Sequence, residues 1–233
     1  YLTDRLLNEG YEVSGTVKPD AIEKRSERDG VSLYGGDLLD QKFISKVINK
    51  TAPDIVFHLA SYTSPAKSFS LPYETITNNI GITVNLLEAL KNTHTKILLV
   101  GSADEYGIVK DNENPISEAN SFRPTNPYAV SKIAQDFLGL QYFLSHGMNI
   151  VRVRPGNQIG PMQRPDFVVA AFAEQIAKAE YGYMDPIINV GNLESIRDFT
   201  DVRDMVDAYV LAILHGKIGE VYNLGSQKGI KIR

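Results

Sequence analysis

Apolar residues along this chain fall into two alternating patterns: short continuous runs, and longer stretches in which they recur with helical spacing. The continuous runs are rich in β-branched residues and end in small or polar ones. A run that is apolar throughout, rather than at every second position, predicts a strand covered on both faces. Such strands are predicted at residues 11–17, 31–38, 53–61, 96–107 and 149–160, and the last of them runs into a loop.

Between these runs, apolar residues return every three or four positions, as they do on one face of a helix. The pattern of residues 165–180 is typical of a helix that packs into a core, with Phe167 and Phe172 as its packing residues. Gly10 and Gly147 follow the last periodic residue of their helices, where glycine is a common stop. Helices are predicted from the start of the chain to Gly10 and at residues 41–51, 73–93, 126–147 and 165–180.

The alternation of strand and helix predicts an α/β fold, a Rossmann-like doubly wound parallel sheet with right-handed crossovers. In an open sheet of this kind, the ligand crevice lies beyond the carboxyl ends of the strands. We therefore expect the strand ends to face one common cleft. These ends are Asp37, Leu59–Ser61, Val100–Asp104 and Arg154–Asn157.

Composition narrows the function classes. The formal net charge of −4 gives no electrostatic footprint for nucleic acid or for an anionic membrane. The chain has no cysteine, which excludes disulfides, thiolate metal sites and cysteine catalysis. No apolar run is long enough to span a bilayer, so we expect a soluble cytoplasmic protein. The histidines lack metal-ligand spacing and predict no metal, and His58 is predicted to be a hydrogen-bonded core residue beside the cleft.

Candidate chemistry comes from the segment NPYAVSK at residues 126–132. Tyr128 and Lys132 stand one helical turn apart, and Ser102 follows a predicted strand. A free phenol has a pKa of about 10, which a nearby ammonium lowers. Tyrosine then exchanges a hydroxyl proton while a nicotinamide exchanges hydride, and the serine polarises the substrate oxygen. Taken singly, Ser102 also fits a turn or cap residue, and Lys132 a solvated surface charge.

Several ordered motifs carry a family resemblance. They are GDLLD (36–40), DIVFHLAS (54–61), NNIGITVNLLEAL (78–90), SADEYG (102–107), NPYAVSK (126–132), RPGNQIGPMQ (154–163) and RDFTDVRDMVDAY (197–209). With these motifs the chain resembles the extended short-chain dehydrogenases/reductases that act on nucleotide sugars. Because independent signals agree along the whole chain, the resemblance is specific.

The resemblance implies an organisation in two parts. Residues 1–156 would form an NAD(P)-binding Rossmann domain. Residues 157–233 would mostly form a small substrate-binding lobe, with elements that return to the Rossmann domain near 197–226. Family members begin with a strand and a glycine-rich turn, whereas this chain opens in the following helix, so we expect a fragment that lacks that first strand and part of the lobe. The resemblance also implies a homodimer that pairs through the helices at 73–93 and 126–147.

The resemblance implies a dinucleotide cofactor and, position by position, its contacts. Members that prefer NAD carry an acidic residue at the end of the second strand, where this chain has Lys18. A lysine there favours NADP, although Asp20 leaves NAD open and Lys18 also fits a solvated loop residue. The implied cofactor-binding residues are Lys18, Asp37, Leu38, Leu59, Ala60, Ser61, Tyr128, Lys132 and Pro155.

The reaction is read from the loop after Ser102. Dehydratases of the family need an acid–base pair there, and this chain offers Ala103, which transfers no proton, and Asp104, which is one methylene shorter than glutamate. Glu105 would point elsewhere in an extended loop. Residues 157–180 and 188–226 are most similar to the group that reduces the 4-keto group of GDP-4-dehydro-6-deoxy-mannose. The alternatives are a GDP-mannose 4,6-dehydratase, a 4-epimerase and, more remotely, a non-catalytic dinucleotide sensor.

Roles on the substrate side follow from the same resemblance. Ser102 and Asp104 are the implied catalytic residues beside Tyr128 and Lys132. The implied contacts of a nucleotide-sugar substrate, GDP-linked in this group, are Ser102, Asn157, Lys178 and Arg197. Arg197 would clamp the diphosphate, because its planar fork suits two oxygens. An ion pair between Arg197 and Asp198 or Glu194 is the alternative. The chain departs from the family at Gly156, where a phenylalanine is usual.

Overall fold

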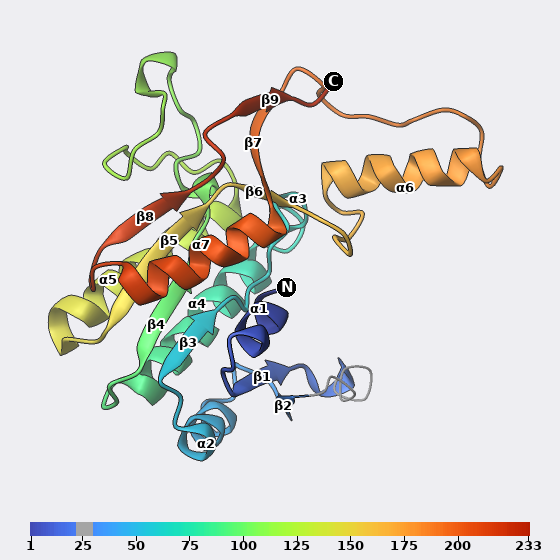
Figure 1. The fold of residues 1–233 in the computed structure, drawn as a ribbon. Coiled ribbons are helices and arrows are strands. Elements are labelled where there is room, and N and C mark those ends of the chain that lie inside the picture. The colour runs from blue at the N-terminus through green and yellow to red at the C-terminus, as the bar shows by residue number, and fades with distance from the viewer. Residues whose placement is uncertain (22–29) are drawn as a thin grey trace.

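The computed structural model describes residues 1–21 and 30–233. Strands and helices alternate through most of the chain (Figure 1). The strands are β1 (Val13–Val17), β2 (Val31–Gly35), β3 (Ile55–His58), β4 (Lys96–Val100), β5 (Ile150–Pro155), β6 (Asn157–Ile159), β7 (Ile196–Asp201), β8 (Val221–Leu224) and β9 (Gly229–Lys231). The α-helices are α1 (Leu2–Asn8), α2 (Gln41–Thr51), α3 (Pro65–Ser68), α4 (Pro72–Leu90), α5 (Pro127–His146), α6 (Val168–Glu180) and α7 (Val202–His215). Short 3-10 turns lie at η1 (Pro19–Ala21), η2 (Ala103–Glu105) and η3 (Asp111–Glu113).

The central sheet is parallel and runs in the order β3-β4-β5-β8. A second parallel pair, β1-β2, lies beside it, and β6-β7-β9 forms a third, mixed sheet. The predicted α/β fold with parallel strands is therefore confirmed. The single sheet that the alternation suggested is instead divided, because in the described part of the chain no strand bridges β1 and β3.

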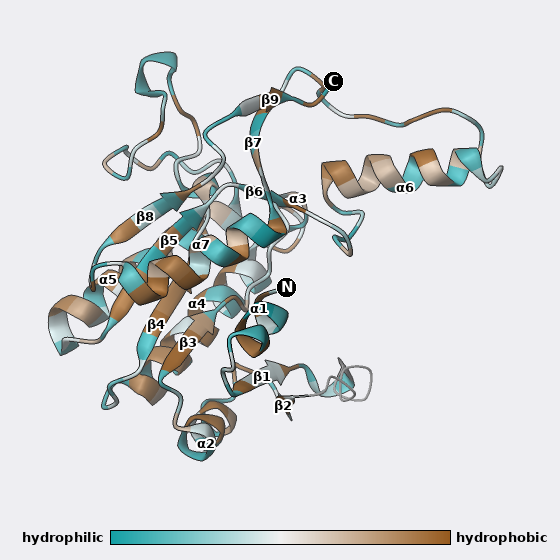
Figure 2. Cartoon of the chain, viewed as in Figure 1, coloured by the Kyte–Doolittle hydropathy of each residue, from teal (hydrophilic) through white to brown (hydrophobic). Residues whose placement is uncertain are grey.

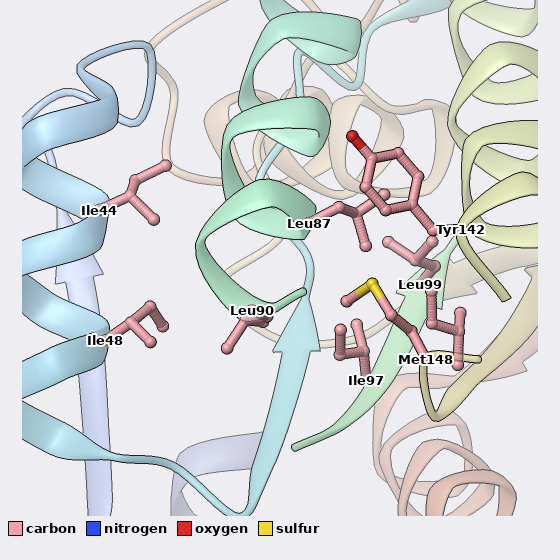
Figure 3. Packing of buried hydrophobic residues seen from close by; sticks show 9 residues of the cluster. Ile44, Ile48, Leu87, Leu90, Ile97, Leu99, Tyr142 and Met148 are labelled. Carbon is pink, nitrogen blue, oxygen red and sulfur yellow. The ribbon is translucent and has the colours of Figure 1, made fainter. Parts of the chain in front are cut away.

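Helices cover both faces of the central sheet, as a doubly wound fold requires (Figure 1). On one face, Ile97 and Leu99 of β4 pack against α2, α4 and α5 (Figure 3). On the opposite face, Leu98 packs with Met205 and Tyr209 of α7. Successive residues of one strand thus serve two cores, which explains why this strand reads as an unbroken apolar run.

Local signals fix helix α5, which carries the candidate chemistry. The Asn126 side chain accepts a hydrogen bond from the backbone N–H of Ala129 at 2.8 Å, and Pro127 occupies the first helical position. Gly147 ends the helix with a φ of +66°, a left-handed conformation that glycine adopts without strain. Tyr128 therefore lies in the first turn of α5, at the edge where the strands end.

Helix α6 corrects one expectation. Its pattern predicted a helix that packs into a core around Phe167 and Phe172, yet none of its residues is buried. In Figure 1 it stands away from the central sheet, and Figure 2 shows hydrophobic segments along this helix. An amphipathic period predicts a helix with an apolar face, but it does not say which layer covers that face.

The described residues include no helix that is both long enough and apolar enough to cross a membrane.

Candidate active site

The loop after β4 is built around Ser102. The Ser102 hydroxyl accepts from the backbone N–H of Asp104 at 3.2 Å, and the Ser102 backbone N–H donates to Glu105 Oε1 at 2.8 Å. Together they form a capping box that closes the turn η2. The serine is therefore a cap residue as well as a site candidate, and the two interpretations of Ser102 are compatible.

Tyr128 and Lys132 reach the same place from α5. Both are buried, with exposures of 8% and 3%, and the Lys132 nitrogen lies 5.9 Å from the centre of the Tyr128 ring. Lys132 donates to the carbonyl of Val100 at 2.8 Å, while the Tyr128 phenol hydrogen-bonds the side chain of Ser102. The fold thus brings Ser102, Tyr128 and Lys132 together, which excludes a solvated surface lysine.

Burial is the largest influence on the pKa values of Tyr128 and Lys132. It raises the pKa of Tyr128 above its ordinary value, against the lowering effect of the Ser102 hydrogen bond. Burial also lowers the pKa of Lys132 to about 8, with the Glu105 carboxyl acting in the other direction. We expected the lysine to lower the pKa of the phenol, but in this protein burial is the largest influence on that pKa and raises it. Tyr128 is consequently a neutral phenol and a proton donor at neutral pH.

Asp104 and Arg197 lie close enough to interact electrostatically. Burial raises the pKa of the Asp104 carboxyl, and the positive charge of Arg197 opposes that rise. Arg197 donates to the carbonyl of its neighbour Ile196 at 2.8 Å. The alternative ion pairs are taken elsewhere, since Asp198 accepts from the loop at Ser226 and Glu194 pairs with Lys231. The guanidinium therefore keeps donors for a ligand.

Arg154 was expected to face the cleft, and the structure corrects this. Its side chain is 5% exposed and turns inward, where it donates to Asp136 Oδ2 from Nε at 2.8 Å. It also lies 3.1 Å from Glu105 Oε2 and donates to the Tyr106 hydroxyl at 2.8 Å. Asp136 further accepts from Arg152 at 2.6 Å. Both arginines can be buried inside the sheet because each hydrogen-bonds the carboxylate of Asp136.

His58 is a buried, hydrogen-bonded residue, as predicted. Its Nε2 lies 2.9 Å from the Thr83 hydroxyl, which also accepts from Gln135 at 2.6 Å. Burial, and then the charge of Lys132, lower the pKa of His58 to about 3, so the ring is neutral. In the described residues there is no cluster of three or more histidine or acidic side chains suited to a metal.

The residues proposed to hold a dinucleotide line the ends of β1, β2 and β3. Asp37 turns the chain after β2 by accepting from the backbone of Leu39 at 2.9 Å, and Leu38 packs against the α2–α4 core. Leu59 is exposed and Ala60 and Ser61 are partly so, which leaves a small-residue surface at the end of β3. Pro155, the last residue of β5, is buried.

The positions of two lysines, Lys132 and Lys18, bear on whether this part of the fold can hold a dinucleotide. An ammonium has three N–H donors, and among the described residues Lys132 hydrogen-bonds only the Val100 carbonyl, so buried donors remain for ribose hydroxyls. Lys18 lies just after β1, with its nitrogen 5.6 Å from the centre of the Tyr62 ring in the segment after β3. Both positions suit a nucleotide that crosses the strand ends. The contact of Lys18 with a 2′-phosphate stays a prediction.

The remaining substrate-side candidates, Asn157 and Lys178, lie in the part of the chain after β5. Asn157 is an exposed residue of β6, paired with Phe199 of β7. Lys178 lies on α6 and forms an ion pair with Glu174 at 2.8 Å. Its contact with a phosphate stays a prediction. A Cβ at Gly156 would lie 3.4 Å from the carbonyl oxygen of Asp198 and 3.6 Å from that of Leu224, which are ordinary van der Waals contacts.

Sequence reasoning missed the buried charge cluster of Glu105, Asp136, Arg152 and Arg154. One signal was available, because two arginines stand at alternate positions of the apolar strand sequence IVRVRP. Side chains at alternate positions share a face of the sheet, and charges inside a covered sheet need partners. The identity of those partners depends on contacts across the fold.

Comparisons with known proteins show which family, relatives and solved structures this chain resembles. The sequence model of the NAD dependent epimerase/dehydratase family matches residues 1–225. The chain is 41% identical over 183 residues to a GDP-6-deoxy-D-mannose reductase of Pseudomonas aeruginosa, covering 78% of this chain and 60% of the relative. It is 29% identical over 221 residues to a GDP-mannose 4,6-dehydratase of Vibrio cholerae, covering 88% of this chain and 59% of that protein. The chain thus spans about three fifths of the length of these relatives.

Solved structures agree with the fold. A structure of RMD from Pseudomonas aeruginosa complexed with NADPH superposes with a TM-score of 0.84 at 33% identity, over 96% of this chain and 79% of that one. A UDP-glucose 4-epimerase of Thermotoga maritima with UDP-glucose gives a TM-score of 0.89 at 25% identity, over 99% of this chain and 74% of the other.

Proposed function

The chain belongs to the NAD dependent epimerase/dehydratase family, and from that premise we propose that the full-length gene product is a nucleotide-sugar reductase. Its reaction is reduction of the 4-keto group of a GDP-4-dehydro-6-deoxyhexose to a hydroxyl. A bound NAD(P)H supplies the hydride that goes to C4. The relative with 41% identity carries the name of such a reductase, which supports the assignment.

The site residues have distinct roles in this reaction. Tyr128 donates its phenolic proton to the oxygen at C4, so that hydride and proton together convert the carbonyl into an alcohol. Ser102 hydrogen-bonds the same oxygen and holds it next to the phenol. Lys132 holds the cofactor ribose with the donors that its Val100 contact leaves over. The raised pKa of Tyr128 keeps the phenol protonated, as a proton donor must be.

The burial of Glu105 is the observation that favours reduction over dehydration. Dehydration needs an acid–base pair, one group to remove the C5 proton and another to assist loss of water from C6. Glu105 is fully buried and its carboxyl hydrogen-bonds the Ser102 backbone, so it does not reach a sugar. Ala103 transfers no proton, which leaves Asp104 as the one carboxyl of this loop on the substrate side. Reduction needs no second carboxyl.

The positive charges of Arg197 and Lys18 support the proposed substrate and cofactor, respectively. Arg197 would bind the diphosphate of a GDP-linked sugar with its guanidinium fork, and Asn157 a neighbouring polar group. Lys18 would favour NADP over NAD by meeting the 2′-phosphate. NADPH is present in the structure of the Pseudomonas protein, and NAD in a related epimerase of Thermus thermophilus.

Assembly is proposed from the exposed apolar surface of two helices. Tyr73 of α4 is 75% exposed, and Phe137 and Leu144 of α5 are 52% and 70% exposed. Large exposed apolar side chains on a soluble enzyme are often covered at a subunit interface. We therefore propose a homodimer that pairs through α4 and α5. A cytoplasmic location and the absence of nucleic-acid or membrane partners stay predictions.

The assay that tests this function uses the full-length gene product with NADPH and GDP-4-dehydro-6-deoxy-mannose. Oxidation of NADPH, equimolar with sugar consumed, is the expected result. Conversion of GDP-mannose into its 4-keto-6-deoxy product with only a catalytic amount of cofactor would instead identify a dehydratase, and would mean that Asp104 acts alone at C5.

A further inference from the structure

Glu105 occupies an unusual place directly beneath the reacting groups. It is fully buried, and its two carboxyl oxygens have different surroundings. Oε1 accepts from the Ser102 backbone N–H at 2.8 Å. Oε2 is buried without a hydrogen bond, although Arg154 Nε lies 3.1 Å away. The proposed reaction assigns this side chain no role.

The backbone makes room for this carboxyl. Gly101 ends the strand segment before Ser102, and a Cβ at that position would lie 2.3 Å from Glu105 Oε1. That is closer than side chains approach one another, so the carboxyl fills the space that the glycine leaves free. Glu105 therefore packs between Gly101 at the end of β4 and Arg154 of β5.

The cluster also connects the Ser102 loop to the catalytic helix. Arg154 lies beside Glu105 and donates to Asp136 Oδ2 at 2.8 Å. Asp136 lies on α5, one turn beyond Lys132 and two turns beyond Tyr128. Buried, mutually satisfied polar networks hold their members in one arrangement more firmly than isolated contacts do. A path of buried polar contacts therefore runs from the Ser102 backbone to the helix of the phenol and the ammonium.

We propose that Glu105 is a positioning residue that fixes Ser102 against Tyr128 and couples the Ser102 loop to helix α5. This inference rests on the proposed reductase function for its catalytic consequence.

The neutral form accounts for the contacts of both oxygens. A carboxylic acid accepts through one oxygen and donates through the other, so a protonated Oε2 can donate to the Asp136 carboxylate, which lies within hydrogen-bonding reach. Burial and the Asp136 carboxylate raise the pKa of Glu105 above its ordinary value, against the lowering effects of the Ser102 backbone N–H and Arg154. The remaining charges near this acid are the ammonium of Lys132 and the guanidinium of Arg152, which faces Asp136.

The test compares Glu105→Leu with Glu105→Gln in the full-length protein. Glutamine keeps an acceptor for Ser102 and a donor for Asp136, as the neutral acid does, whereas leucine keeps neither. We expect E105L to lower kcat at least about tenfold with KM for the sugar nucleotide within about twofold, because the loss lies in the arrangement of reacting groups. We expect E105Q to restore kcat to within about threefold of wild type.

The matched control is Glu118→Leu. Glu118 is exposed and accepts from the Asn223 backbone at 2.7 Å, and its carbonyl accepts from Arg154, but it does not touch Ser102. E118L should leave kcat unchanged. Gly101→Ala displaces the Glu105 carboxyl without altering it, and should lower kcat as E105L does.

Amide hydrogen exchange separates this inference from the proposed function. E105L should speed exchange of the Ser102 amide at least about tenfold, and E105Q should not, whatever reaction the enzyme catalyses. Should wild type fail to oxidise NADPH while this exchange pattern holds, the reductase assignment fails and the positioning role stands. If E105L does not fold, turnover and Ser102 amide exchange in E105Q decide whether the proposal stands. Slow turnover and fast exchange in E105Q, or unchanged turnover in E105L, would overturn the proposal.

Discussion

The ammonium nitrogen of Lys132 lies 5.9 Å from the centre of the Tyr128 ring, one helical turn away on the same face of α5. Its hydrogen bond goes to the strand β4, not to the phenol. The lysine thus lies between the catalytic helix and the strand end, where a cofactor ribose would pass. Helix spacing explains why these two residue types stand four positions apart.

Replacing Tyr128 by phenylalanine should remove the proton donor and little else. We expect turnover to fall at least about 100-fold, in line with the usual contribution of general acid catalysis, while binding of the GDP-sugar persists. Steady-state kinetics and calorimetric titration measure the two quantities. Tyr142→Phe is the control on the same helix, since that hydroxyl donates to Glu88 at 2.7 Å away from the site. Unchanged turnover in Y128F would remove Tyr128 from the mechanism.

Replacing Arg197 by alanine should weaken substrate binding more than chemistry. Loss of charge-assisted hydrogen bonds to a diphosphate should raise KM about tenfold or more while kcat stays within about threefold. Arg203→Ala is the control, because Arg203 is engaged with Asp201 at 2.6 Å and lies on the exposed side of α7. Equal KM values for R197A and R203A would show that Arg197 does not bind the diphosphate.

Replacing Asp136 by asparagine should destabilise the fold. The Asp136 carboxylate accepts hydrogen bonds from both Arg152 and Arg154 in the interior, at 2.6 Å and 2.8 Å, so loss of its charge removes the ionised partner of both guanidinium groups. Breaking a buried pair in this way costs about 3–5 kcal/mol of unfolding free energy, which urea denaturation measures. Asp201→Asn, at an exposed pair where asparagine still caps α7, should change stability far less.

His58 predicts how stability depends on pH. Its pKa in the folded protein is about 3, well below the ordinary value of 6.5, because the ring is buried. As the pH falls below 6.5, the unfolded chain takes up a proton on His58 and the folded chain does not. The unfolding free energy should therefore decline by up to about 1.4 kcal/mol per pH unit between these two pKa values.

His58→Gln removes this titration and so isolates it from the carboxylates that titrate in the same range. The stability of wild type relative to H58Q should decrease as the pH is lowered from 7 toward 4, about the range in which the histidine protonates when unfolded. Chemical denaturation at several pH values measures the difference, with His215→Gln at the exposed end of α7 as the control. A constant difference between wild type and H58Q would contradict the buried neutral ring.

Short-range signals account for most of what could be predicted. The asparagine, proline and glycine at the ends of α5 are local, so the position of Tyr128 and Lys132 on one face followed from the chain itself. The carboxyl ends of parallel strands share one edge of the sheet, which brought Ser102 to the same place. The convergence of these three residues was therefore predictable, and the structure contains it.

Contacts between distant segments account for what could not be predicted. The partners of Arg154 come from η2 and α5, residues 105 and 136, and no local pattern pairs them. The same holds for Tyr128, whose pKa is set by burial rather than by its neighbour on the helix. The packing predicted for helix α6 was wrong for a related reason, because an apolar face does not identify the layer against which it packs.

The central claim is that NADPH transfers a hydride to C4 of the sugar, and an isotope label on the cofactor tests it most directly. The full-length gene product is given NADPH labelled with deuterium at the transferable position of the nicotinamide, together with GDP-4-dehydro-6-deoxy-mannose. Mass spectrometry and NMR then locate the label. Our account predicts one deuterium at C4 of the product sugar for each cofactor oxidised. A product without deuterium at C4, or unchanged cofactor while GDP-mannose is converted into its 4-keto-6-deoxy form, would contradict it.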